Sequence, residues 1–108
     1  MKVVIDIGKS FSRFPAGRDK EDGPFSGERF CIEFLLPEIN KNREIDVLLD
    51  GTAGYGSSFL EEAFGGLVRR GVSGEHIHRS IKLLSEDQSL IKEIWGYIDD
   101  EVTRAGGK

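Results

Sequence analysis

The 108-residue sequence lacks several features that would place it in a specialised class of protein. It has a single cysteine, Cys31, so no internal disulfide bridge can form. Its apolar runs are only a few residues long, far short of the roughly 20 that cross a membrane, and nothing after Met1 has the pattern of an export signal. We therefore expect a cytoplasmic protein without a membrane segment, in which Cys31 is a buried thiol without a chemical role.

Clustered positive charge and clustered metal ligands are also missing. The formal net charge is −4, and Arg69 and Arg70 are the only adjacent arginines, which disfavours nucleic-acid binding. His76 and His78 have no second group of ligands at a suitable spacing and are expected to flank the start of a strand. We therefore expect no metal and no other cofactor.

The balance of residue types is that of a globular domain, with 31% charged and 38% hydrophobic residues. A chain of this length can bury one self-supporting core. We expect a single domain over residues 1–104, followed by a disordered tail at 105–108.

Apolar periodicity predicts strands that alternate with helices. The predicted strands cover residues 2–7, 44–50 and 77–83, and the predicted helices cover 28–36, 57–70 and a last segment that begins with a capping box at Ser85 and Gln88. Pro37 is expected to stop the first helix, and the run 44–50 is typical of a central strand covered on both faces. The pattern predicts an α/β fold, in which about three helices pack on a mostly parallel or mixed central sheet.

The segment GTAGYGSS, residues 51–58, joins the predicted central strand to a helix. Ligands of such sheets bind beyond the carboxyl ends of strands, and free amides at a helix start suit an anion. Ser57 stands where a phosphate-binding loop needs lysine, and the second glycine of a serine-hydrolase elbow is missing. We therefore expect no catalytic residue and no enzyme activity, and the candidate ligand- or partner-binding residues here are Gly51, Thr52, Gly54, Tyr55 and Gly56.

Ser57 and Ser58 are the candidate phosphate acceptors of this segment. A phosphoserine at a helix start is stabilised by the dipole, and its charge of roughly −2 would change the docking face. Ser58 and Glu61 also have the S-x-x-E spacing of a capping box, in which the serine only caps the helix. Spacing alone favours the cap.

Two further features allow a structural and a functional interpretation. Gly65 and Gly66 are unfavourable inside a helix, so they indicate either tight packing on a neighbouring element or a patch where a partner docks. Arg18 lies in the long aperiodic segment 10–27. It either holds a phosphate or carboxylate near Ser57 or forms a salt bridge with Asp19, Asp22 or a carboxylate at the core edge.

Three separated segments carry a family resemblance: PAGR (15–18), DGPFSGERF (22–30) and LLDGTAGYGSSFLEEAFGGLVR (48–69). Together they resemble the STAS-like family of domains of unknown function, relatives of the anti-sigma-factor antagonists, and the resemblance covers nearly the whole chain. It implies a small STAS-like sandwich with a role in prokaryotic regulation or signalling.

The resemblance also implies a mechanism. In the antagonists a GHKL-type serine kinase phosphorylates a serine at the start of the helix after a central strand, and the unmodified form binds that kinase to free a sigma factor. Ser57 and Ser58 match the serine pair. Gly56 stands where the antagonists have an aspartate, and Phe59 stands where they have a glycine.

Three functional hypotheses follow. The first is a non-enzymatic regulatory partner-switch or adaptor module that binds a protein partner, a GHKL-type kinase or ATPase, through the loop 51–58 and the exposed side of helix 57–70, and that is controlled by serine phosphorylation. The second is a nucleotide- or small-anion-binding domain that uses the glycine-rich loop and Arg18. The third is a structural module that forms a homo-oligomer through a free strand edge.

Overall fold

A computed structural model describes residues 2–106, and its strands form one parallel sheet. The strands β1 (Lys2–Asp6), β2 (Glu44–Leu48) and β3 (Ile81–Leu84) lie in the order β1-β2-β3. Ile45 of β2 is opposite Val3 of β1 and Ile81 of β3. The predicted α/β class with a parallel sheet is confirmed, and the predicted strand 44–50 is its middle strand.

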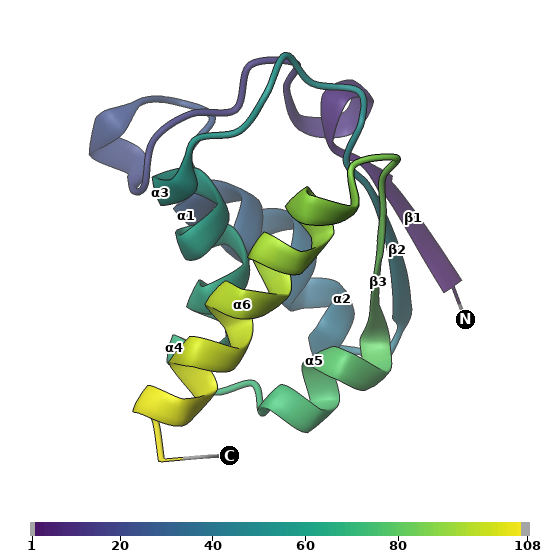
Figure 1. The fold of residues 1–108 in the computed structure, drawn as a ribbon, viewed down its shortest axis with the longest axis vertical. Coiled ribbons are helices and arrows are strands. Elements are labelled where there is room, and N and C mark those ends of the chain that lie inside the picture. Colours follow the sequence, from purple (N-terminus) through teal and green to yellow (C-terminus); the bar gives the residue numbers. More distant parts are fainter. Residues whose placement is uncertain (1, 107–108) are drawn as a thin grey trace.

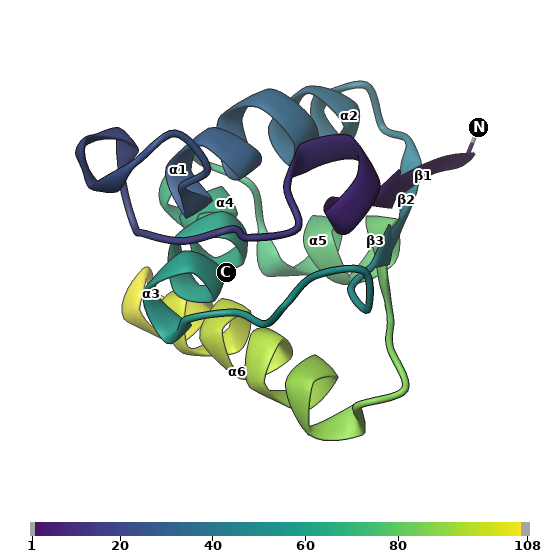
Figure 2. The ribbon, with the colours of Figure 1, turned by 90° about the horizontal axis from the view of Figure 1, so that it is seen from above.

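The helices gather on one side of this sheet (Figures 1 and 2). Two long helices each consist of two α-helical parts joined without a break by a π-helical turn. We refer to them as helix 27–40 and helix 57–69. The first consists of α1 (Gly27–Phe30), η3 (Cys31–Leu35) and α2 (Leu36–Asn40), and the second of α3 (Ser57–Leu60), η4 (Glu61–Gly65) and α4 (Gly66–Arg69). The remaining helical elements are η1 (Ile7–Phe11), η2 (Lys20–Asp22), α5 (Gly74–Ser80) and α6 (Gln88–Arg104).

One face of the sheet carries the hydrophobic core. Its buried strand residues pack with the helices and are Ile5, Ile45, Val47, Ile81 and Leu83. On the opposite face Val4 is 57% exposed, and Lys2 forms a surface ion pair with Asp46 at 3.5 Å. The prediction that strand 44–50 is covered on both faces is therefore wrong, because Asp46 alternates with buried neighbours as it does in a strand with one solvated face.

An aromatic cluster ties the segment after β1 to the two long helices. The Phe11 ring meets the rings of Phe30 and Phe34 edge to face, with centroids 5.1 and 5.3 Å apart, and lies 6.2 Å from Phe59. Helix 27–40 and helix 57–69 approach closely at Gly27, where a Cβ would lie 3.0 Å from Ala63 N and still closer to Phe59 O. The core thus fixes the start of helix 57–69 against the segment after β1 and against helix 27–40.

Pro37 does not end the first long helix, which continues to Asn40. The π-turn Cys31–Leu35 ends two residues before the proline and is closed by a hydrogen bond from Leu36 N–H to Cys31 O. A wider turn of this kind accommodates a residue that has a ring and no N–H donor. The predicted boundary at residue 36 is therefore wrong.

Two predictions in the second half of the chain are also corrected. Residues 77–80, predicted as strand, form the end of α5, because Ser73 caps that helix by accepting from His76 N–H at 3.1 Å. His76 and His78 therefore lie inside a helix rather than beside a strand. The N-cap of α6 is Asp87, which accepts from the amides of Ser89 and Leu90, so the predicted capping box at Ser85 is absent.

The C-terminal end of α6 leads into a short turn at residues 105–106. The rest of the tail that the sequence predicts to be disordered, residues 107–108, lies outside the described residues.

Candidate functional site

The glycine-rich loop 51–56 starts at the carboxyl end of β2 and runs over the upper end of the molecule into helix 57–69 (Figure 1). The Tyr55 hydroxyl donates to Leu49 O at 2.7 Å, and Ala53 N–H donates to Arg13 O at 2.8 Å. Burial raises the pKa of Tyr55 to about 12, so the phenol keeps its proton and this hydrogen bond at neutral pH. The loop is therefore fixed at two points.

The segments that follow the other two strands contact the start of the glycine-rich loop and the residue before it. A Cβ at Gly8, just after β1, would lie 2.9 Å from Gly51 Cα, so only glycine permits this approach of the two backbones. Asp50 accepts from the Ser85 hydroxyl at 2.5 Å and from Glu86 N–H at 2.8 Å. The Ser85 hydrogen bond, followed by that of Glu86, holds the pKa of Asp50 below its ordinary value.

Ser57 and Ser58 begin helix 57–69, and both are exposed. The N-cap residue is Gly56, and no side chain caps this helix. The predicted capping box of Ser58 and Glu61 is therefore wrong: Ser58 lies one residue inside the helix, and the Glu61 carboxylate binds arginines instead. The structure leaves the hydroxyl-bearing first turn at the surface.

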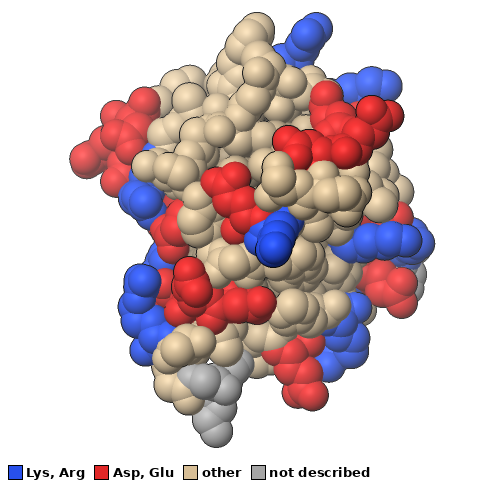
Figure 3. All heavy atoms as spheres, viewed as in Figure 1, with Lys and Arg blue, Asp and Glu red and all other residues tan. Residues whose placement is uncertain are grey.

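An exposed aromatic side chain lies next to this loop. Phe14 is 70% exposed and follows Arg13, whose carbonyl binds the loop at Ala53. Residues 51–58 contain no charged side chain, and the upper middle of the face in Figure 3 is mostly free of Lys, Arg, Asp and Glu. We refer to residues 51–58 together with Phe14 as the loop surface.

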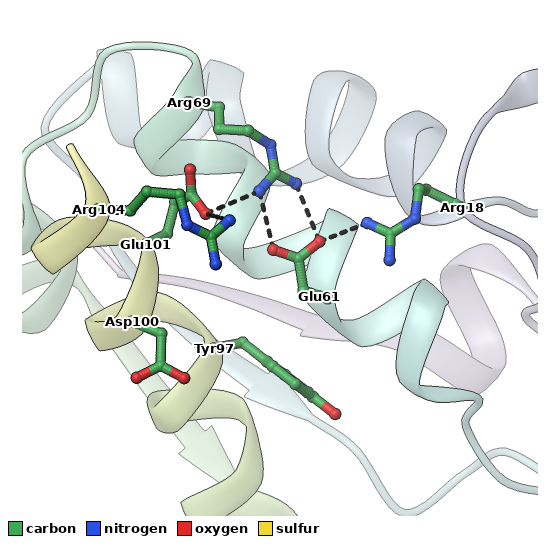
Figure 4. Close-up of a pocket in the computed structure, with 7 residues that line it drawn as sticks. All are labelled: Arg18, Glu61, Arg69, Tyr97, Asp100, Glu101 and Arg104. Carbon is green, nitrogen blue, oxygen red and sulfur yellow. Dashed lines mark hydrogen bonds and ion pairs between the residues drawn. The ribbon is translucent and has the colours of Figure 1, made fainter.

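A second feature lies where helix 57–69 faces α6. It is a pocket of about 480 Å³, and its lining consists of Arg18, Glu61, Arg69, Tyr97, Asp100, Glu101 and Arg104 (Figure 4). Three arginines from three different segments line it together with three carboxylates, and the arginines pair with Glu61 and Glu101. The charges compensate one another, so the pocket is an ion-pair network rather than an open anion site.

Glu61 is the centre of the network. It accepts from Arg69 at 2.8 and 3.2 Å and also pairs with Arg18. The hydrogen bond from Arg69, with a smaller contribution from Arg18, holds the pKa of Glu61 below its ordinary value, and the same pairing raises the pKa of Arg69. Glu101 is only 6% exposed and binds Arg69 at 3.2 Å and Arg104 at 2.9 Å.

Arg18 forms the salt bridge that the sequence left as one alternative, with carboxylates at the core edge. Its guanidinium pairs with Glu61 and lies 3.6 Å from Glu62. The pocket lining contains Arg18 but no residue of the loop 51–58. The nucleotide- or anion-binding hypothesis therefore loses the arginine that it placed beside the glycine-rich loop.

Gly65 and Gly66 are both buried. A Cβ at Gly65 would lie 2.9 Å from Glu61 Oε2, and one at Gly66 would lie 2.6 Å from an Arg70 nitrogen. The missing side chains thus leave room for the ion pairs of their own helix, while Tyr97 O of α6 and Cys31 Sγ of helix 27–40 lie 3.6 Å away. The packing interpretation fits these glycines, and a partner that docks directly on them does not.

Sequence reasoning missed the ion-pair network. Glu101 stands in the acidic run 99–101 of α6, a pattern typical of a solvent-exposed side, yet it is buried. Glu61 and Arg69 are eight residues apart, and the π-turn η4 between them brings them to one face of the helix. That spacing matches no α-helical pair, so no local pattern in the sequence indicated this ion pair.

The remaining chemical groups give no further site. Cys31 is buried, as predicted, and burial raises its pKa to about 11, which keeps the thiol protonated and unreactive. Within residues 2–106, no group of three or more His, Cys, Asp or Glu residues could hold a metal ion. No helix in this part of the chain has the length and apolar character needed to cross a membrane.

Comparison with known proteins defines the class of this fold and site. The family model described as "STAS-like domain of unknown function (DUF4325)" matches residues 26–90, more than half of the chain, and the protein belongs to this family. The matched part runs from Ser26, the N-cap of helix 27–40, through the glycine-rich loop to the start of α6. Membership indicates a regulatory domain of the anti-sigma-factor-antagonist type, and such domains are generally non-enzymatic. No curated protein and no solved structure matches the chain significantly.

Proposed function

We propose that this protein is a non-enzymatic regulatory adaptor that binds a protein partner, a GHKL-type kinase or ATPase, through the loop surface. One observation carries the proposal. An uncharged loop beyond the carboxyl end of β2 is held rigidly by Tyr55 and Ala53, beside an aromatic side chain, Phe14, that is 70% exposed.

Covering such a surface favours binding for two physical reasons. Burying a phenylalanine side chain contributes roughly 1.5–3 kcal/mol, and aromatic anchors commonly dominate the binding energy of protein interfaces. A loop that is already fixed loses little conformational entropy on binding. The loop surface combines both properties, whereas the arginines of the charged pocket are already paired with carboxylates.

Control by serine phosphorylation is part of the proposal. Ser57 and Ser58 are exposed within an otherwise uncharged surface. A phosphate there adds a charge of roughly −2, which a partner that buries Phe14 would have to desolvate. The unmodified protein is therefore the binding form, and the modified protein the released form.

The test is affinity capture with the full chain, followed by a measurement on the purified complex. Proteins captured from the native host lysate are identified by mass spectrometry, and the Kd of the captured ATPase or kinase is measured by calorimetry. Phe14→Ser is expected to raise that Kd roughly 10- to 100-fold, the equivalent of the lost aromatic burial. Val4→Thr changes another exposed apolar residue, on the open sheet face, and should leave the Kd unchanged.

Equal effects of the two substitutions, or none from Phe14→Ser, would refute the assignment of the loop surface. Failure to capture any ATPase or kinase with the wild-type protein would refute the assignment of the partner.

A further inference from the structure

Arg18 is placed differently relative to Ser57 and to Ser58, and the sequence did not indicate this difference. Residues three and four apart are neighbours on a helix surface, with Cβ atoms roughly 5–6 Å apart. Ser58 precedes Glu61 by three positions and Glu62 by four, and Arg18 pairs with both of these carboxylates. Ser57 has only Glu61 as such a neighbour. Figure 4 shows the Arg18 guanidinium directed at Glu61. Arg18 therefore faces the side of helix 57–69 on which Ser58 lies.

Arg18 can leave Glu61 without leaving that carboxylate unpaired. Glu61 keeps two hydrogen bonds from Arg69, at 2.8 and 3.2 Å. Glu62 keeps hydrogen bonds from Arg69 at 2.7 Å and Arg70 at 3.1 Å. The Arg18 side chain is 45% exposed, so it can turn toward a new partner while both carboxylates remain paired.

A phosphate on Ser58 would need such a cation. It would stand one helical turn from two carboxylates, and like charges at this spacing destabilise a helix. An arginine fork binds a phosphate through two parallel hydrogen bonds, which makes it a stronger partner than a lysine would be. Arg18 can pair with this phosphate without leaving Glu61 or Glu62 unpaired.

We propose that Arg18 is the receptor for a phosphate group on Ser58, and that it passes from Glu61 to this phosphate when the serine is modified. In the modification, Ser58 Oγ forms a bond to the γ-phosphorus of ATP within a kinase. The bond from that phosphorus to the β–γ bridging oxygen breaks, ADP leaves, and the hydroxyl proton passes to a base of the kinase. The inference rests on the proposed function and specifies how that function is controlled.

The change takes place close to the partner-binding surface, because Arg18 and Phe14 are four residues apart in the segment 10–27. The Arg18 backbone is held by a hydrogen bond from Glu28 N–H to Arg18 O at 2.9 Å, so it is the side chain that turns toward Ser58. Phosphorylation therefore alters the loop surface by its charge while the backbone beside it stays in place.

The experiment uses the full chain with phosphoserine incorporated biosynthetically at position 58, and a matched protein with phosphoserine at position 57. The second pKa of each phosphate, about 6 in a free phosphoserine, is followed by ³¹P NMR titration. Arg18→Gln is expected to raise this pKa at position 58 by about half a unit or more and to raise it clearly less at position 57. Arg29→Gln, which removes an arginine that pairs with Glu33, should change neither.

The Arg18 Nε resonance provides a readout without any substitution of the arginine. It should shift with the ionisation of phosphoserine at position 58 and not with that at position 57. Equal pKa changes at the two positions, or an Arg18 resonance that ignores the phosphate, would overturn the inference.

Neither measurement needs a partner or a host kinase. If no partner binds the loop surface, the proposed function fails while the pairing of Arg18 with the phosphate can still be observed. If the partner binds and the pairing is absent, only the inference about Arg18 fails.

Discussion

The close approach of the two long helices at Gly27 gives the sharpest prediction about the fold. A Cβ on residue 27 would lie 3.0 Å from Ala63 N and 3.1 Å from Glu62 Cβ, and still nearer to Phe59 O. These are atoms of helix 57–69 that cannot rotate away, so Gly27→Ala must push the two helices apart. Overpacking of this kind costs about 1–3 kcal/mol, and it also displaces the first turn that carries Ser57 and Ser58.

Gly96 provides the matched control, because it lies in the middle of α6 and a Cβ there would meet nothing within 4 Å. Gly96→Ala removes the same backbone freedom without a collision and should stabilise the protein by about 0.5–1 kcal/mol. Both variants are measured by urea unfolding, followed by far-UV circular dichroism. Fluorescence is unsuitable, because Trp95 is adjacent to Gly96 and its signal would respond to the substitution itself. The free energies of unfolding should move in opposite directions, by a difference of about 1.5–4 kcal/mol. If the two variants change stability equally, the helices do not meet at Gly27 in the way described.

Three further predictions concern individual contacts. Tyr55→Phe removes the hydrogen bond to Leu49 O, which should cost about 1 kcal/mol and speed hydrogen exchange of the loop 51–56; unchanged exchange would mean that the tyrosine does not anchor the loop. Cys31 should react with a thiol reagent about 100-fold more slowly in the folded protein than in urea, since burial raises its pKa from 9.0 to about 11, and fast labelling of the native protein would contradict its burial. The pKa of Glu61 is lowered from 4.5 by Arg69, so the stability that Glu61 contributes is present above about pH 4.5 and is lost as the pH falls through the lowered pKa. The stability difference between wild type and Glu61→Gln, measured by urea unfolding at several pH values, should therefore shrink on acidification, and a constant difference would exclude the ion pair.

The sequence contained most of the information on the fold and less on the site. The apolar periodicity located β1, β2 and helix 57–69, and the alternation of strands with helices indicated a parallel sheet. It could not distinguish one covered face from two, because Leu48 and Leu49 make the central run look continuous although Asp46 lies on the open face of the sheet. At residues 77–80 the alternating pattern suits a strand as well as a helix, and the cap at Ser73 decides for the helix.

The errors at the site share a physical cause, which is competition from residues distant in sequence. Ser58 and Glu61 have the spacing of a capping box, but Glu61 is taken by Arg18, 43 positions away, and by Arg69 across a π-turn. Glu101 belongs to an acidic run that is otherwise exposed, and arginine partners keep it buried. Local patterns predict local hydrogen bonds correctly only where no stronger charged partner arrives from elsewhere in the fold.

The central claim is that a protein partner docks on the loop surface, and site-specific photocrosslinking in the native host tests it most directly. Benzoylphenylalanine replaces Phe14 in one strain and Val4, on the open face of the sheet, in another. After irradiation, crosslinked products are separated and identified by mass spectrometry. The account predicts a crosslink from position 14 to one ATPase or kinase and none to that protein from position 4. A crosslink to the same protein from position 4, with none from position 14, would contradict the account and move the docking site to the open sheet face.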